Sequence, residues 1–184
     1  MIKRFILIVN NKGYSPADGR KIIENLRSLG YRVVDVRVAK NHVEVDLLSE
    51  FPPFVEGFEL LETVEIGETT TVDREDDFRK AVDLFNRERF WEAHETLEPI
   101  WRSSKGVEKQ VLHGLILTAA AFVHLQKNDR HGFQSILKRA LKNLSAGMKT
   151  YRGIDLNDLV HKVNEAMKSE QAFTIATVDK PKNL

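Results

Sequence analysis

The chain has 184 residues, with 28 basic and 27 acidic side chains and a formal net charge of +1. This balance argues against a general nucleic-acid-binding protein, which needs a basic patch or stripe. Hydrophobic residues make up 42% and charged residues 30%, a composition typical of a chain that folds around a core in water. The sequence contains no cysteine, which excludes disulfide bonds, thiolate zinc sites and cysteine nucleophiles.

No apolar run in the sequence approaches the roughly 18 residues that a membrane-spanning helix needs. The first ten residues, MIKRFILIVN, place basic side chains before an apolar run, as a signal peptide does. That run covers only Phe5 to Val9, and no small-residue cleavage site follows it, so it is interpreted as a strand. We therefore expect a cytoplasmic protein without a membrane partner.

Residues 1–70 have the pattern of a small sheet with one helix. The run Phe5 to Val9 suits a buried central strand, and apolar residues at helical spacing follow it up to a stop at Gly30. "YRVVDVRV" and "HVEVDL" alternate in polarity around Lys40 and Asn41, which predicts a hairpin with Val34, Val36 and Val38 on one face. The paired prolines of "EFPPFVEG" exclude a central strand, and "FELLETVEI" is expected to be the last strand.

The order strand-helix-strand-strand-strand predicts a ferredoxin-like-type α/β sheet domain whose second helix is missing or very short. After the linker "GETTTVDRED", residues 71–176 predict an all-α helical bundle of about five helices. Asp73 and Asp155 are expected N-caps, and the apolar, small-residue-rich "LHGLILTAAAFVHL" marks a central buried helix. We thus expect an α+β two-domain chain that ends in a tail at residues 177–184.

One predicted helix, from about Phe90 to Arg102, concentrates polar side chains in "RFWEAHETLEPIWR". Because helical residues advance about 100° each, Phe90, Ala93, Leu97 and Trp101 share an apolar stripe. A polar strip lies beside that stripe and contains His94, Glu95, Glu98 and Arg102. Glu92 falls on the opposite side, at about 160° from His94, and is expected to be solvated.

A short "SSKG" loop returns the chain antiparallel, which places His113 of the next helix level with this strip. His113 is therefore expected to face His94 and Glu98, and these three side chains could hold a divalent metal. His124 lies 11 positions beyond His113 and about 16 Å further along the axis. Candidate catalytic residues are His94, Glu95 and Glu98, and candidate binding residues are Trp91, Arg102, His113 and His124.

The sequences "LFNRERFWEAHETLEPIWR" and "LHGLILTAAAFVHLQKND", with the helix that follows them, resemble domain-of-unknown-function family 309. The resemblance covers about residues 76–146, includes the Glu-Ala-His-Glu motif, and implies a compact all-helical domain. It implies no activity. Pro99, His113 and Leu117 depart from the family pattern, so a metal site that uses His113 would not be a general feature of the family.

These residues support two main hypotheses. The favoured one is a binding or assembly module, in which a buried His-Glu-Arg network fixes helix register and the chain binds a copy of itself or another protein. The alternative is a hydrolase, possibly metal-dependent, that uses the cluster of His94, Glu95 and Glu98. A third hypothesis, a nucleic-acid accessory role, depends on five basic residues in "KRALKNLSAGMKTYR".

Overall fold

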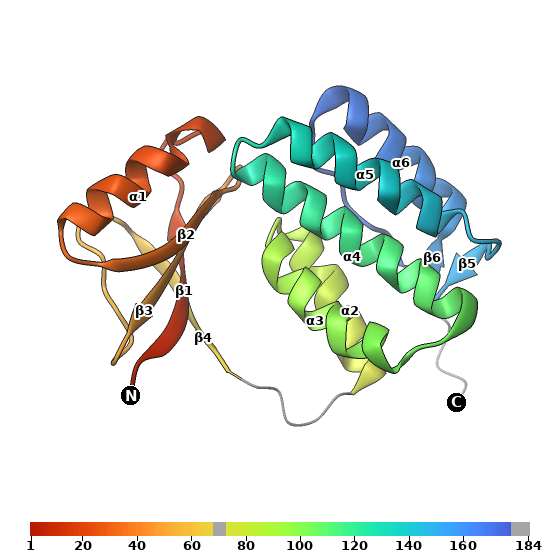
Figure 1. Ribbon diagram of the computed structural model, residues 1–184, viewed down its shortest axis with the longest axis horizontal. Coiled ribbons are helices and arrows are strands. Elements are labelled where there is room, and N and C mark those ends of the chain that lie inside the picture. Colours follow the sequence, from red (N-terminus) through yellow and green to blue (C-terminus); the bar gives the residue numbers. More distant parts are fainter. Residues whose placement is uncertain (68–72, 178–184) are drawn as a thin grey trace. The chain divides into compact units, whose positions relative to one another are not determined.

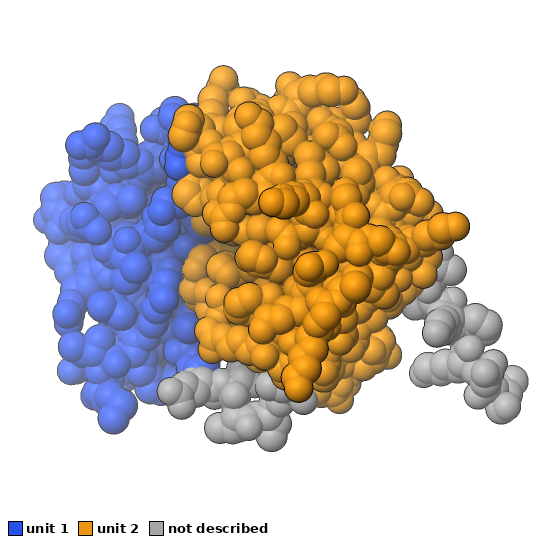
Figure 2. Space-filling view, turned by 45° about the vertical axis from the view of Figure 1, so that its right-hand side comes forward, with its two compact units in different colours: residues 1–70, 126–129 blue, residues 71–125, 130–184 orange. Residues whose placement is uncertain are grey.

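The computed structural model describes residues 1–67 and 73–177. The chain divides into two compact units, residues 1–70 with 126–129, and residues 71–125 with 130–184 (Figure 2). The predicted linker residues 68–72 lie outside the described residues, as do residues 178–184 of the predicted tail. The domain boundary proposed at residue 70 therefore stays a prediction.

As far as the structure describes it, the first unit is a four-stranded antiparallel sheet with one α-helix (Figure 1). Its elements are β1 (Lys3–Asn10), η1 (Pro16–Asp18), α1 (Gly19–Ser28), β2 (Arg32–Val38), β3 (His42–Ser49) and β4 (Leu60–Ile66). The strand order β2-β3-β1-β4 separates β1 from β2 by one antiparallel strand, as in a ferredoxin-like sheet. Residues 50–59, between β3 and β4, form no helix, so the predicted loss of the second helix is confirmed.

One face of this sheet packs against α1. Leu7 and Val9 of β1 lie in the same buried cluster as Ile22 and Leu26 of α1. On β2 the expected face was partly wrong, because Val34 is exposed and Val33 is buried in its place. The pairing of β2 with β3 shifts register between Val33 and Asp35, and such a bulge moves the preceding side chain to the other face.

A charged network lies on the same strands and was not foreseen. Arg37 is 1% exposed, and its Nε donates to Oε2 of the fully buried Glu44 at 2.5 Å. Arg4 donates from Nε and Nη2 to the two carboxylate oxygens of Asp46, at 2.9 and 2.7 Å. Burial is the largest single influence and raises the pKa of Glu44, but the charge and hydrogen bond of Arg37 and the interactions with His42 together outweigh it, so the pKa lies below its ordinary value. The network therefore keeps the fully buried carboxylate of Glu44 charged.

In its described residues, the second unit contains five helices and a two-stranded hairpin (Figure 1). These are α2 (Arg74–Asn86), α3 (Phe90–Ser103), α4 (Gly106–Gln126), α5 (Arg130–Leu144), β5 (Thr150–Tyr151), β6 (Ile154–Asp155) and α6 (Leu156–Ser169). Asp73 accepts hydrogen bonds from the backbone of Glu75 and Asp76, and Asp155 caps α6 in the same way. Both predicted N-caps are thus confirmed. Among the described residues, no helix combines the length and apolar character needed to cross a membrane.

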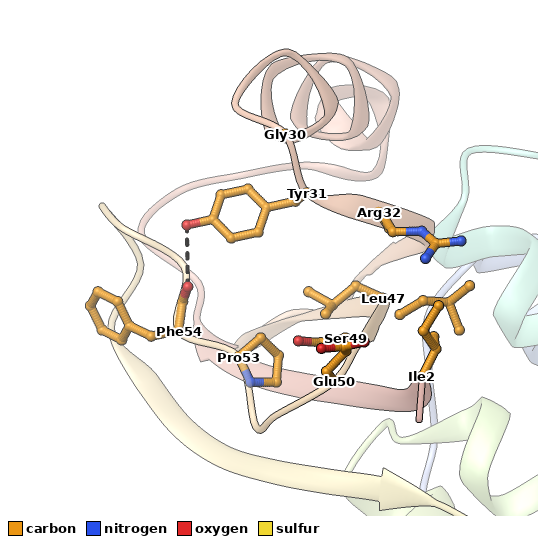
Figure 3. A pocket seen from close by; sticks show the side chains of 10 residues that line it. Ile2, Gly30, Tyr31, Arg32, Leu47, Ser49, Glu50, Pro53 and Phe54 are labelled. Carbon is orange, nitrogen blue, oxygen red and sulfur yellow. Dashed lines mark hydrogen bonds between the residues drawn. The ribbon is translucent and has the colours of Figure 1, made fainter.

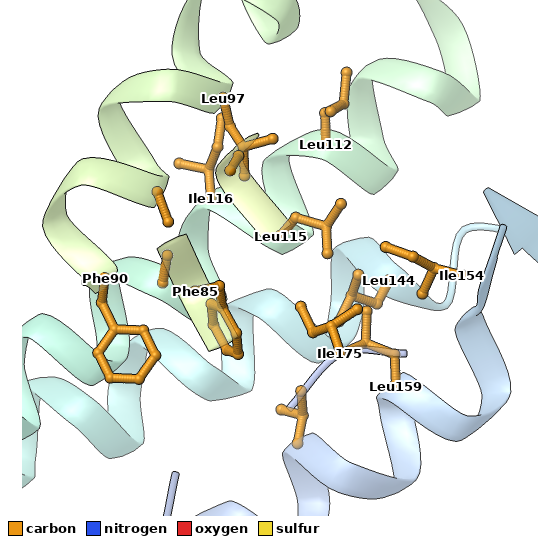
Figure 4. Packing of buried hydrophobic residues seen from close by; sticks show 14 of the residues in the cluster. Phe85, Phe90, Leu97, Leu112, Leu115, Ile116, Leu144, Ile154, Leu159 and Ile175 are labelled. Atoms are coloured by element: carbon orange, nitrogen blue, oxygen red, sulfur yellow. The ribbon is translucent and has the colours of Figure 1, made fainter. Parts of the chain in front are cut away.

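Helix α4 forms the centre of this unit, as its all-round apolar sequence predicts. Its Leu112, Ala119 and Ala121 have no exposed surface. Figure 4 shows Leu112, Leu115 and Ile116 of α4 among side chains from the other helices. A Cβ atom at Gly114 would lie 2.7 Å from Cγ of Leu144 and 3.0 Å from its backbone nitrogen. Glycine therefore permits the close approach of α4 and α5.

Replacing Gly114 with alanine should lower the free energy of unfolding by about 1–3 kcal/mol, because the added methyl group overpacks the contact with Leu144. The matched control is Gly67→Ala, where a Cβ atom would meet nothing within 4 Å. Urea unfolding followed by circular dichroism measures both variants. Equal stability of the two variants would contradict the role assigned to Gly114.

Candidate functional site

The motif lies on α3, as predicted, and the core fixes the orientation of this helix. Phe90, Ala93 and Leu97 are buried in the cluster that α2, α3 and α4 share, and Trp101 packs partly against it. Ile100, which has no exposed surface, extends this buried side. The apolar residues therefore hold α3 in place and leave the polar strip at the edge of the core.

Three of the four predicted strip residues form one row of adjacent polar side chains. His94 Nε2 lies 3.4 Å from Glu98 Oε1, and Arg102 Nη2 pairs with the other oxygen of Glu98. The side chains of His94 and Glu98 are 25% and 28% exposed. Glu95 and Arg102 are exposed. The expectation of a buried network was therefore wrong, because the row lies at the boundary between the core and the solvent.

His113 packs against Trp101. The two ring centroids are 5.5 Å apart, and Lys109 Nζ lies 4.8 Å from the centroid of the same Trp101 ring. In the part of the chain that the structure describes, no three His, Asp or Glu side chains are grouped so that they could hold a metal ion. The predicted metal site of His94, Glu98 and His113 is therefore not formed.

The remaining predicted binding residues lie elsewhere. His124 is partly buried near the end of α4, 11 residues beyond His113 and thus about 16 Å along the helix axis. Trp91 is partly buried in the first turn of α3. The structure thus brings His94, Glu98 and Arg102 together, and sets Trp101, Lys109 and His113 into a second group across α3 and α4.

The prediction that Glu92 is solvated was also wrong. Glu92 is 8% exposed and accepts from Arg89 through both carboxylate oxygens, from Nε at 2.6 Å and from Nη2 at 2.8 Å. The buried arc of α3 is wider than one stripe, since it passes from Leu97 through Ile100 to Glu92, about 140° around the helix. A polar residue at i+3 from an arginine, in the first helical turn, was the signal that could have revealed this pair.

A second polar cluster at one end of the bundle was not foreseen. Arg74 Nη2 donates to Ser104 Oγ at 2.7 Å and to Glu108 Oε1 at 3.0 Å. The hydroxyl of Tyr151 donates to the same Glu108 oxygen at 3.0 Å. Arg152 donates from Nη1 to the Arg74 carbonyl at 2.8 Å and forms an ion pair with Glu75. The cluster therefore joins the β5–β6 hairpin to the first turns of α2 and α4.

This cluster weakens the hypothesis of a nucleic-acid accessory role, because it engages one of the basic residues on which that role depends. Arg152, one of the five basic residues counted for nucleic-acid binding, has a side chain only 18% exposed that is paired with Glu75.

Burial raises the pKa of Tyr151 to about 12, and hydrogen bonding to Glu108 adds to this effect although the Arg152 charge opposes it.

The sheet unit contains a pocket of about 460 Å³ that the sequence did not reveal. Gly30 and Tyr31, just before β2, and Arg32, its first residue, line one side, and Glu50, Pro53 and Phe54 line it from the loop after β3. Figure 3 shows the Tyr31 hydroxyl pointing to the Phe54 carbonyl, to which it donates at 3.2 Å. None of the predicted site residues borders this pocket.

Replacing Glu92 with glutamine should cost about 3 kcal/mol of unfolding free energy, because the Arg89 charge then lacks its buried carboxylate partner. Glu95→Gln is the matched control on the exposed side of the same helix, and its effect should stay within about 0.5 kcal/mol. Chemical denaturation of both variants measures the difference. If the ion pair between Arg89 and Glu92 contributed nothing to stability, the two variants would give indistinguishable unfolding curves.

The raised pKa of Tyr151 predicts loss of stability at alkaline pH. Because the pKa of Tyr151 in the folded chain lies above the unfolded value of 10.0, its protonated hydroxyl adds to the free energy of unfolding. This contribution is complete below pH 10 and is lost as the pH rises towards about 12. Tyr151→Phe should therefore flatten the decline of the melting temperature between about pH 10 and about pH 12. An absorbance titration at about 295 nm should lose its last tyrosine step in this variant, and an unchanged last step would exclude Tyr151 as its source.

The comparisons with known proteins identify a family for the helical unit and give no activity. The family model described as domain of unknown function (DUF309) matches residues 78–136. A crystal structure of a conserved hypothetical protein from Thermus thermophilus is 30% identical, with a TM-score of 0.44, over 50% of this chain and 97% of that one. The search of curated proteins found no match, and the N-terminal region has no family match. Residues 78–136, in the helical part of the chain, are thus similar to the DUF309 family.

Proposed function

We propose that the helical unit is a binding or assembly module whose partner docks on the surface shared by α3 and α4. This docking surface consists of Trp101, Lys109 and His113 together with the row of His94, Glu98 and Arg102. The observation that carries the proposal is the half-buried Trp101 ring, which contacts both His113 and Lys109. Tryptophan and arginine are enriched among the residues that dominate protein interfaces.

The state of Glu98 supports binding over hydrolysis. A general base must have a carboxylate oxygen available for the proton it abstracts. Oε2 of Glu98 pairs with Arg102, and Oε1 lies 3.4 Å from His94 Nε2. Glu95, on the same helix, is exposed to solvent. A hydrolase that used Glu98 as general base would have only Oε1, beside His94, to take up the proton while the pair between Oε2 and Arg102 persists.

The charges of this surface indicate the kind of partner. Lys109 contributes positive charge beside the Trp101 ring, while the charges of Arg102 and Glu98 are paired with each other. A protein surface with an aromatic or aliphatic centre and an acidic rim would complement this arrangement. Such a partner could be a second copy of the chain or another protein, in agreement with the hypothesis of an assembly role.

Site-specific photo-crosslinking tests this proposal. A crosslinking residue at position 102 should yield a discrete adduct with the partner in cells of the source organism, and mass spectrometry identifies it. Lys109→Glu should reduce the yield about tenfold or more, because a reversed charge at the edge of an interface opposes an acidic partner. Lys138→Glu, an exposed lysine of α5, is the matched control and should leave the yield unchanged.

Two outcomes would contradict the binding module. One is an adduct of equal yield from crosslinkers at positions 102 and 138. The other is hydrolysis of a phosphate, ester or amide substrate by the purified chain that His94→Gln abolishes without changing its stability. The second outcome would assign the α3 row to catalysis.

A further inference from the structure

The chain continues after α6 as an extended segment, residues 171–177, called here the tail segment. Asn86, the last residue of α2, holds this segment by its backbone in both directions. Asn86 Nδ2 donates to the Ile175 carbonyl at 2.9 Å, and Asn86 Oδ1 accepts from the Ile175 amide at 2.7 Å. Lys162 Nζ of α6 adds a third backbone contact, donating to the Thr174 carbonyl at 3.2 Å. These three bonds recognise an extended backbone and no particular side chain.

Two side chains of the tail segment enter the helical unit. Phe173 contacts the rings of Phe85 and Phe122, with centroid separations of 5.4 and 5.6 Å. Ile175 is 6% exposed, and Figure 4 shows it among Phe85, Leu115 and Leu159. Thr174, between them, points outward and is exposed. The tail segment is therefore held as an extended peptide is, with alternate side chains in apolar sites and its backbone hydrogen-bonded.

The receiving surface and the tail segment come from different parts of the sequence. Phe85, Asn86, Leu115 and Phe122 all lie within residues 78–136, which the DUF309 family model matches. The tail segment lies outside that range. The domain thus carries a surface that binds an extended peptide, and this chain covers it with residues of its own.

We propose that this surface, formed by Phe85, Asn86, Leu115, Phe122 and Lys162 and called the tail groove, is a peptide-binding site that the tail segment occupies in cis. Its ligand is an extended segment of another protein with an aromatic residue and, two positions later, an aliphatic one. This pattern is that of Phe173 and Ile175. The groove shares no residue with the docking surface of α3 and α4, so it is a second and separate binding site.

The cis arrangement would regulate access to the groove. A tethered segment has an effective concentration of about the millimolar range, so a free peptide competes only when the tail segment is released or when the peptide binds much more tightly. The two hydrogen bonds between Asn86 and Ile175 then help to keep the tail segment in the groove. Any partner that draws the tail segment away exposes the apolar sites for Phe173 and Ile175.

A full-length variant with a weakened tail tests this proposal. Phe173→Ser with Ile175→Asp should release the tail segment, because both changes place polar groups in apolar sites. A fluorescent peptide of residues 170–177 should then bind at least about 100-fold more tightly to this variant than to the unchanged chain, as measured by anisotropy. Adding Asn86→Ala should weaken binding about tenfold or more.

Matched peptides provide the controls. A peptide N-methylated at the Ile175 amide should also lose affinity, because it lacks the N–H that donates to Asn86 Oδ1, whereas a Thr174→Ser peptide should bind unchanged because that side chain is exposed. Lys109→Glu should have no effect on peptide binding, which separates this test from that of the α3–α4 docking surface. Equal binding of peptide by the variant and the unchanged chain would overturn the proposal. Dimers of the unchanged chain that vanish in the variant would also overturn it, since the occupant would then be a second copy.

Hydrogen exchange on the unchanged chain keeps the proposal testable if the double variant does not fold. The Ile175 amide should exchange by local opening, at least about 100-fold faster than the amides of Leu112 and Ala119 in α4. Asn86→Ala should accelerate it about tenfold further and leave α4 unaffected. Exchange of Ile175 only together with α4 would show that the tail segment is a fixed part of the core, and would overturn its role as a removable occupant.

Discussion

The structure of the helical unit depends on the burial of α4. The ring of Phe122 contacts Phe85 of α2, Phe90 of α3, Phe133 of α5 and Phe173 of the tail segment, with centroid separations between 4.8 and 5.9 Å. One side chain thus contacts four separate parts of the chain. Aromatic pairs at such separations prefer tilted or offset geometries, so each ring restricts the orientation of the others. The position of α3, and therefore of its polar row, follows from this packing.

The wide buried arc of α3 determines what its polar residues do. A glutamate inside the arc, such as Glu92, must have a partner of opposite charge, because an unpaired buried carboxylate is strongly unfavourable. Arg89 supplies that partner. A glutamate at the edge of the arc, such as Glu98, can keep contact with water while it pairs with His94 and Arg102. The motif therefore combines a structural ion pair with a polar row that a partner can reach.

Periodicity and end signals in the sequence were sufficient to predict the helices, the hairpin and the two N-caps, because these depend on neighbouring residues. Side-chain environments were harder to predict where they depend on several elements at once. The helical wheel placed Glu92 correctly in angle, but it could not show how far burial extends around α3. The bulge that buries Val33 and exposes Val34 depends on the pairing of β2 with β3, which alternation alone does not reveal. Likewise, His113 was expected to face His94 and Glu98, but its ring packs against Trp101.

Asn86 lies in the stretch that resembles the DUF309 family, but its hydrogen-bond partner, Ile175, lies outside that stretch. Asn86 follows Phe85 in the resemblance to DUF309, and helix propensity gives no reason for an asparagine at this position. Its amide can both donate and accept, and it uses both functions on the backbone of Ile175, 89 residues away. A hydroxyl or a carboxylate in the same place could not match both groups with this geometry. The amide is thus suited to binding an extended chain, whether that chain is the protein's own tail segment or another that takes its place.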